Sequence, residues 1–421
     1  MFSKIKLVLR DHMIRRRILV TLGLLVVFRV LASIPIPGVD SFRLSQFFGN
    51  NQFFGLLNVF SGGGLSNLSI VMLGVGPYIT GSIIMQLLTM MIPRLKAMYQ
   101  EEGEAGRKKF SQYGRLLSIP LAFIQAMSFI VLLEKQGVVA DLSRFDLIVN
   151  TLVVTGGSVL LMWIGELITE FGIGNGTSLI IFGGIVAHLP VAVGQLLYTY
   201  DSSKFLTYLA FLIVALFIVY AVVFITEAER PIPITYAKRI RGNKVYGGIS
   251  TYLPLRLNQA GVIPIIFALS IMLFPQLILN VVKGSVLNQN IKDIAENILS
   301  FVTNGWVYGV CYFFLVFIFT YFYTAITFDP HQISENLQKN GAFIPGVRPG
   351  QSTSEFIGKI LTRITLAGAL FLGCIAVLPL VIKALTNITS IAVGGTALLI
   401  AVSVIIDLAK KIEAQISMRE Y

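Results

Sequence analysis

Long, unbroken apolar segments dominate the hydrophobic pattern of this chain. Each approaches the roughly 20 residues that a helix needs to cross the hydrocarbon core of a membrane. The segments are continuous rather than alternating, which favours helices over the strands of a membrane β-barrel. The pattern therefore predicts an all-α integral membrane protein with ten transmembrane helices. The predicted spans are Ile18–Ile34, Leu68–Ile92, Leu116–Leu133, Leu147–Ile168, Leu179–Leu197, Phe205–Ile225, Ala260–Val282, Val307–Phe328, Ile364–Ile382 and Ile391–Leu408.

Composition supports this class of protein and excludes two others. Of the 421 residues, 55% are hydrophobic and 13% are charged, whereas soluble proteins carry about 25% charged residues. Intrinsic disorder requires low hydrophobicity and high charge, the opposite of this balance. The first apolar segment follows Arg15–Arg17 as a signal peptide would. It lacks a small-residue cleavage site and continues into IPIPG at 34–38, so we interpret it as a retained span.

Lys and Arg residues are distributed unequally between alternate loops. With the N-terminus in the cytoplasm, the cytoplasmic segments hold 25 of the 33 Lys and Arg residues and the external loops hold seven. Because cytoplasmic loops are enriched in these residues, both termini are predicted to be cytoplasmic. The net charge of +12 then belongs to the cytoplasmic face, where it attracts anionic lipids. The excess could also serve an anionic partner such as ribosomal RNA or an acidic protein surface.

Two predicted cytoplasmic loops, residues 226–259 and 329–363, are longer than ordinary connections and are therefore expected to be functional. The first contains a basic tip, Lys238–Lys244, in which Gly242-Asn243 is a turn signal between strand-like residues. This pattern predicts a hairpin. The simpler alternative is a solvated loop whose charges only fix the topology.

Groups that could carry enzyme chemistry are scarce in this sequence. Arg29, Glu166 and Asp407 lie in or at the ends of spans, where an edge charge explains them about as well as a proton relay does. The GIGNG sequence at 172–176 lacks the Lys of a phosphate-binding loop. Three scattered His and two Cys residues form no ligand cluster. We predict no enzyme, metal or cofactor, and an intramembrane protease lacks the nucleophile–base pair it needs.

Glycine and proline occur at matching positions in two spans. Span two carries GVGP at 74–77 and span seven carries GVIP at 261–264, and each is the second span of a five-span half. Broken helices at matching positions are typical of membrane proteins built from two repeats. The match predicts two pseudo-symmetric halves, residues 1–200 and 201–421. An ion-coupled secondary transporter is therefore the main alternative function, although no midplane acid pair is visible to bind an ion.

A glycine-rich stretch precedes span two, with the sequence NVFSGGGLSN at 58–67. Three consecutive glycines disfavour a helix by up to about 1 kcal/mol each relative to Ala. The stretch is external and amphipathic, so it is either a flexible connector or a displaceable element. Isoleucines recur at i,i+4 in span two and in span five, and from the sequence alone these are ordinary core or lipid-facing residues.

Several segments together resemble the SecY family of protein-conducting channels. They occur in family order over nearly the whole chain, and they include LSIVMLGVGPYITGSIIMQLL at 68–88 and WIGELITEFGIGNGTSLII at 163–181. IPIPG at 34–38, GVIPIIFALSIMLFP at 261–275 and GAFIPGVRPG at 341–350 are also similar to family segments. His188 in span five is a departure from which we derive no consequence.

The resemblance implies two five-helix halves around a central hourglass pore in a bacterial plasma membrane. It implies that unfolded preproteins cross through this pore and that a signal sequence or apolar segment leaves sideways into lipid. The implied energy source is the SecA ATPase or the ribosome, because the chain has no phosphate-binding loop of its own. SecE and SecG are implied as small membrane partners.

The resemblance also assigns roles to particular residues. An apolar ring that closes the pore by excluding water would consist of Ile79, Ile83, Ile181, Ile185, Ile266 and Ile400. A plug at about residues 58–68 would comprise Phe60, Ser61, Gly62, Gly63, Gly64, Leu65, Ser66 and Asn67, and its low helix stability would make displacement easy. A lateral gate between spans 2–3 and 7–8 would include Gln125 and Asn258. Docking residues for SecA or the ribosome would be Lys238, Arg239, Arg241, Lys244 and Arg348.

Overall fold

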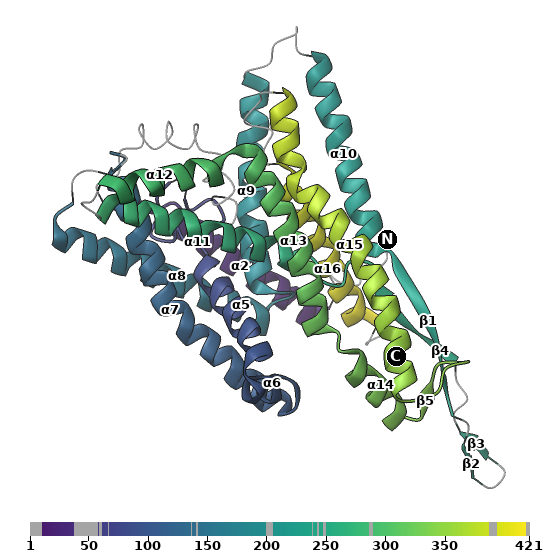
Figure 1. Ribbon diagram of the computed structural model, residues 1–421. Coiled ribbons are helices and arrows are strands. Elements are labelled where there is room, and N and C mark those ends of the chain that lie inside the picture. Colours follow the sequence, from purple (N-terminus) through teal and green to yellow (C-terminus); the bar gives the residue numbers. More distant parts are fainter. Residues whose placement is uncertain are drawn as a thin grey trace. The chain divides into compact units, whose positions relative to one another are not determined.

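The computed structural model describes residues 11–37, 58, 61–65, 67–135, 137–139, 142–198, 205–237, 239–241, 244–246, 250–285, 289–386 and 394–417. Most of these residues are helical (Figure 1). The helices are α2 (His12–Ala32), α5 (Gly76–Met91), α6 (Pro93–Gln100), α7 (Gly103–Lys135), α8 (Arg144–Phe171), α9 (Gly176–Tyr198), α10 (Phe205–Glu227), α11 (Ile263–Ser285), α12 (Gln289–Thr303), α13 (Gly305–Thr327), α14 (Pro330–Lys339), α15 (Gln351–Thr386) and α16 (Gly394–Ser417). The strands are β1 (Glu229–Tyr236), β2 (Arg239–Arg241), β3 (Lys244–Tyr246), β4 (Ser250–Arg256) and β5 (Ala342–Phe343).

Each of the ten predicted spans coincides with a helix or with most of one, which confirms the predicted fold class. Among the described residues, four helices are long and apolar enough to cross a membrane by length and composition. They lie in α7, α8, α13 and α15. The pair α5 and α6 makes a fifth if it is counted as one span, and it is bent by 116°. Pro93 opens α6 at this bend, in the first turn of the helix, where the missing amide of a proline leaves no hydrogen bond unmade.

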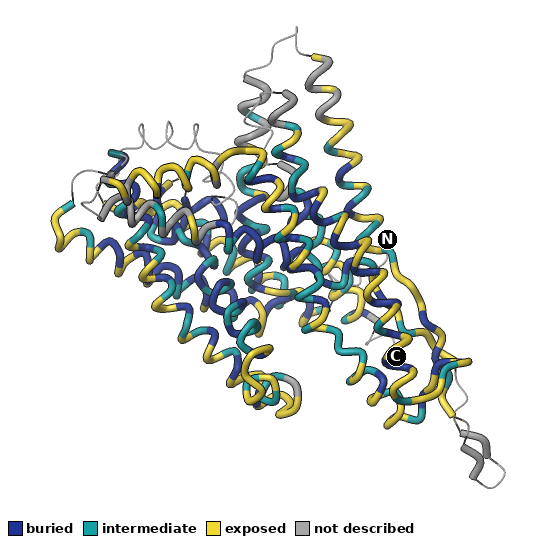
Figure 2. Tube along the Cα trace, in the orientation of Figure 1, coloured by how far each residue is buried: buried dark blue, intermediate teal, exposed yellow. Residues whose placement is uncertain are grey.

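Many large apolar residues of the helices are exposed, and Figure 2 shows exposed residues along most of the helices. Helix α10, for example, exposes Ile213, Phe217 and Phe224, and its apolar residues surround the whole helix. A helix that is apolar all round needs a protein core or lipid around it. The exposed apolar faces of these helices therefore fit the surroundings of a membrane protein.

The helix of span two begins later than the sequence predicted. The prediction started the span at Leu68, whereas residues 68–75 form turns and α5 begins at Gly76. The backbone has positive φ at Leu68 (41°) and at Gly74 (59°), which a right-handed helix does not allow. Ser158 of α8 donates a hydrogen bond to the Gly74 carbonyl at 3.0 Å. This bond gives the carbonyl a partner in a segment that is not helical.

The chain divides into two compact units. The first comprises Met1–Leu212, Ser270–Val307 and Pro379–Tyr421, and the second comprises Ile213–Leu269 and Tyr308–Leu378. This grouping follows contacts within each unit and does not test the predicted halves 1–200 and 201–421, which stay a prediction.

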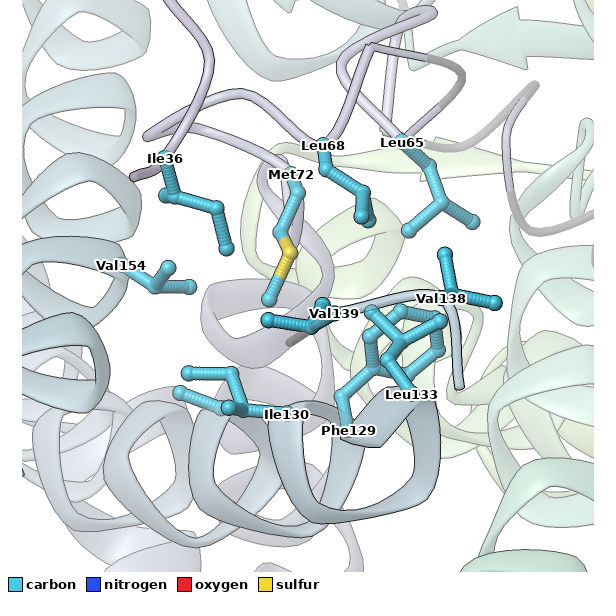
Figure 3. Close-up of a cluster of buried hydrophobic side chains, with 11 residues drawn as sticks. Ile36, Leu65, Leu68, Met72, Phe129, Ile130, Leu133, Val138, Val139 and Val154 are labelled. Carbon is cyan, nitrogen blue, oxygen red and sulfur yellow. The ribbon is translucent and has the colours of Figure 1, made fainter. Parts of the chain in front are cut away.

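An apolar core in the first unit joins both ends of the segment between α2 and α5 to the helices α7 and α8 (Figure 3). Ile36 follows α2, Leu65, Leu68 and Met72 precede α5, and all four are buried against the helices. The backbones of these two segments are also paired. Ile36 N donates to the Leu68 carbonyl at 2.9 Å and Ile70 N donates to the Ile34 carbonyl at 3.0 Å. The remaining members of the core are Ala126, Phe129, Ile130, Leu133, Val138, Val139 and Val154.

The second unit carries a small sheet beside its helices. Strand β1 pairs antiparallel with β4 and with β5, so the strand order is β4-β1-β5. Ile232 and Ile234 of β1 alternate with exposed prolines and are buried, as a strand with one packed face requires. Beyond this sheet, β2 and β3 pair with each other. The two long loops of the sequence therefore fold together as one structure, which we call the platform (residues 229–256 and 330–363).

Candidate functional site

The basic tip of the first long loop is a hairpin, as the sequence predicted. Arg239 pairs with Tyr246 and Arg241 pairs with Lys244, which leaves the two residues 242–243 between the strands. Two residues are the usual length of a tight hairpin connection. Lys238 and the side chains of the other predicted docking residues of this tip lie outside the described residues.

Arg348 is exposed on a turn whose backbone is held by two side-chain hydrogen bonds. Ser334 of α14 donates to the Gly350 carbonyl at 2.6 Å, and Thr353 of α15 donates to the Arg348 carbonyl at 2.8 Å. Both hydroxyl-bearing residues are buried. Gly346 and Gly350 have positive φ (83° and 99°), which glycine adopts without strain. The turn therefore presents the Arg348 side chain to solvent on a fixed backbone.

An apolar core lies beneath this turn. Ile357 is fully buried, and Val347 of the turn packs against the same group of side chains. The core draws its members from the sheet, from the turn and from α15, so it joins the two loops of the platform. They are Ile232, Leu255, Ile344, Ile357, Ile360 and Ile364.

The glycine-rich segment before α5 is buried in the part that the structure describes. Residues 61–65 form turns and not a helix, as three consecutive glycines favour. Ser61 Oγ accepts a hydrogen bond from Leu65 N at 3.0 Å, and the Leu65 side chain is fully buried. Phe60 and Ser66 lie outside the described residues. The expectation that weak helix stability alone makes this segment easy to displace is therefore incomplete, because tertiary contacts hold it.

Two spans form the seat of this segment, α2 and α9. Arg29 Nη1 donates to the Gly62 carbonyl at 3.0 Å. A Cβ atom on Gly62 would lie 2.4 Å from Phe28 Cζ, and one on Gly184 would lie 2.0 Å from the Gly62 Cα atom. The glycines therefore serve close packing as well as conformational freedom, a role that composition alone does not reveal. The sequence left open whether Arg29 is an edge charge or part of a proton relay, and the structure gives its guanidinium a backbone partner.

The predicted ring isoleucines are mostly buried. Helix α9 packs against α16 in the first unit, and Ile181, Ile185 and Ile400 on these helices are buried. Ile79 is partly exposed and Ile83 is buried one turn later on α5. Ile266 is buried on α11 in the second unit. The ring as a whole is not tested by these placements and stays a prediction.

The two predicted gate residues have different surroundings. Gln125 is partly exposed on α7 of the first unit. Asn258 lies just before α11 in the second unit, where it is buried, and its Oδ1 atom has no hydrogen-bond partner within the described residues. A buried and unpartnered carbonyl oxygen is unfavourable, which is the kind of cost that proteins tolerate at functional positions.

Charged residues near the other span ends form ion pairs. Glu166 of α8 pairs with Arg115 of α7, and Asp407 pairs with Lys411 one turn later on α16 at 3.2 Å. Asn175 in the GIGNG sequence caps α9, because its Oδ1 atom accepts hydrogen bonds from Thr177 N and Ser178 N. These arrangements are structural rather than catalytic. Among the described residues, no group of three His, Cys, Asp or Glu residues could hold a metal ion.

Fold and site together define a multi-pass helical membrane protein with a structured platform and a buried glycine-rich segment before α5. The model of the SecY family matches residues 69–409. Protein translocase subunit SecY of Mycobacterium bovis is 45% identical over 98% of this chain and 97% of that protein. The corresponding subunit of Corynebacterium glutamicum is 41% identical over 98% and 97%.

Solved structures share the fold. One is described as a protein conducting channel and matches with a TM-score of 0.67 and 19% identity over 96% of this chain and 93% of that one. Canine Sec61 in a ribosome-channel complex matches with a TM-score of 0.64 and 17% identity over 96% and 93%. The chain belongs to the SecY family. This membership confirms the predicted resemblance and the prediction that the chain is not an enzyme.

Proposed function

We propose that this chain is the channel subunit through which unfolded preproteins cross the bacterial plasma membrane and from which apolar segments pass sideways into lipid. One observation carries the proposal, namely 45% identity over 98% of the chain with a protein named as a translocase subunit. The charge distribution supports an orientation with both termini in the cytoplasm. The platform then faces the cytoplasm and the glycine-rich segment faces the exterior.

The pore would be closed by two devices. The first is the ring of Ile79, Ile83, Ile181, Ile185, Ile266 and Ile400, whose branched apolar side chains exclude water and ions. Such contacts are non-directional, so they can part around any side chain of a passing chain. The second is the plug, residues 58–68. Burial of Ser61 and Leu65 supports its role as a seal in the resting state.

The lateral gate would involve Gln125 and Asn258. The unpartnered Oδ1 atom of Asn258 supports this role, since a polar side chain without a partner can gain one when the surrounding helices move. Polar contacts between membrane helices are worth about 0.6–2 kcal/mol. A contribution of this size can bias a gate without locking it.

The platform would dock the SecA ATPase or the ribosome. Its exposed arginine, Arg348, stands on a rigid turn, and the tip residues Lys238, Arg239, Arg241 and Lys244 add positive charge. A basic surface attracts acidic proteins, RNA and anionic lipids. SecE and SecG complete the proposed assembly as small membrane partners, and the signal sequence of the preprotein is the proposed opening ligand.

Reconstitution tests this proposal. The chain is purified with SecE and SecG, inserted into liposomes, and supplied with SecA, ATP and an unfolded preprotein. We expect protease-protected preprotein that requires ATP. A well-folded complex that yields no protected preprotein but accumulates a small solute would overturn the proposal in favour of an ion-coupled transporter.

A further inference from the structure

Two polar side chains from different spans meet at one point of the glycine-rich segment. Arg29 of α2 hydrogen-bonds the Gly62 carbonyl through Nη1 at 3.0 Å. A Cβ atom placed on Gly63 would lie 2.2 Å from His188 Nε2 and 3.3 Å from Arg29 Nη1. The guanidinium and the imidazole therefore both lie against the backbone of Gly63.

The position of His188 is unusual for a polar side chain. Its Nε2 atom is buried and has no hydrogen-bond partner within the described part of the chain. A polar imidazole is costly to place within a membrane span, so histidine is rare there and its presence suggests a function. The imidazole fills the space above a glycine that has φ +84°, so the fit depends on the absence of a side chain at residue 63.

Arg29 makes a different kind of contact. It is a charged donor bonded to a neutral carbonyl at the edge of a membrane span, and such charge-assisted hydrogen bonds are roughly twice as strong as neutral ones. The Gly62 carbonyl is 33 residues away in the chain. The bond is therefore a tertiary contact that must break whenever the segment leaves its seat.

We infer that Arg29 and His188 form a latch that holds the plug in its closed position, Arg29 by binding the Gly62 carbonyl and His188 by packing against Gly63. This inference rests on the plug role proposed above. The latch consists of contacts to the plug backbone. The free energy that keeps the channel closed therefore depends on two span residues that belong neither to the plug nor to the pore ring.

The first test removes the charged bond. Arg29→Met keeps much of the side-chain length and removes the donor, and it also removes a charge from a span, which favours membrane insertion. We expect the resting ion conductance of the reconstituted complex to rise about ten- to a hundredfold, the factor that corresponds to a lost charged hydrogen bond. Arg144→Met is the matched control, because Arg144 is an exposed arginine at the start of α8.

The second test is a double-mutant cycle. Gly63→Ala places a methyl group against His188 Nε2 and is expected to raise the resting conductance. His188→Ala in the same chain removes the obstructing ring, so the double variant should leak less than the sum of the two single effects predicts. Gly103→Ala controls for backbone strain, because Gly103 also has positive φ (+64°) but nothing within 4 Å of its added Cβ.

Conductance and translocation are measured on the same preparations, so that two failures can be told apart. Normal ATP-dependent translocation by the unaltered complex, together with no extra conductance in Arg29→Met and Gly63→Ala, would overturn the latch and leave the proposed function intact. Additive effects of Gly63→Ala and His188→Ala would overturn the His188 contact. Absence of translocation by the unaltered complex would overturn the proposed function itself.

Discussion

The turn that presents Arg348 depends on two buried hydroxyl groups, and their removal gives a sharp prediction. In Thr353→Ala the Arg348 carbonyl loses the donor that lies 2.8 Å away. In Ser334→Ala the Gly350 carbonyl loses its 2.6 Å partner but keeps the Ser354 amide at 3.1 Å. A buried acceptor left without a partner costs about 1–3 kcal/mol. Both hydrogen bonds are part-buried, so we expect Thr353→Ala to stay near the lower end of this range and Ser334→Ala to cost less still.

Hydrogen exchange measures this loss directly. The Val347 amide donates to the Ile344 carbonyl at 3.1 Å inside the turn, so its exchange rate reports local opening. A loss of about 1 kcal/mol corresponds to exchange roughly fivefold faster. Thr362→Ala is the control, because the exposed Thr362 hydroxyl bonds only the Gly358 carbonyl of its own helix at 2.9 Å. Unchanged Val347 exchange in the Ser334→Ala/Thr353→Ala double variant would show that the two hydroxyl groups do not hold the turn. Motor-driven translocation should also fall in that variant, although Arg348 is intact.

Three further predictions concern docking and gating. Arg348→Glu should abolish SecA-driven translocation in a folded complex. Lys359→Glu, at another exposed position of the platform, should not. Unfolding of the Arg348→Glu variant would show instead that Arg348 has a structural role. Replacement of Ile266 or Ile400 by Asn should admit preproteins with defective signal sequences, and an unchanged signal requirement in export assays would argue against the ring. Leu65→Ala should destabilise the closed position of the plug by about 2–5 kcal/mol, the usual cost of truncating a buried leucine. The resting ion conductance should therefore rise. A complex that stays closed would show that Leu65 does not hold the plug.

Local signals account for what the sequence predicted correctly. The spans follow from continuous apolar segments, and the hairpin of β2 and β3 follows from Gly242-Asn243 between strand-like residues. Both features depend only on residues that are close to one another in the sequence. The pairing of β2 with β3 and most helix positions therefore agree with the structure.

Long-range contacts account for what the sequence did not reveal. The pairing of Thr235 with Phe343 joins loops that are more than a hundred residues apart, and no local pattern specifies it. The turns at 68–75 replace a predicted helix because a buried hydroxyl from α8 and the apolar core support them. The helix α12 lies in the segment between predicted spans seven and eight, for which no helix was predicted.

The same limit applies to the plug. Its glycines suggested mobility, because the sequence shows their conformational freedom but not the side chains that press against them. Phe28, Arg29 and His188 come from two different spans, and their convergence on Gly62 and Gly63 is visible only in three dimensions. Consecutive glycines beside membrane spans are thus as consistent with close packing as with flexibility.

Photo-crosslinking can show whether a polypeptide passes through this chain at the proposed ring. A photoreactive amino acid is placed at Ile185, which is buried on α9, or at Val153, which is exposed on the face of α8. A preprotein is then stalled during SecA-driven translocation and the complex is irradiated. We expect crosslinks from residue 185 to the stalled preprotein and none from residue 153. Crosslinks from residue 153 alone, or from neither position while translocation proceeds, would contradict the proposed passage at the ring.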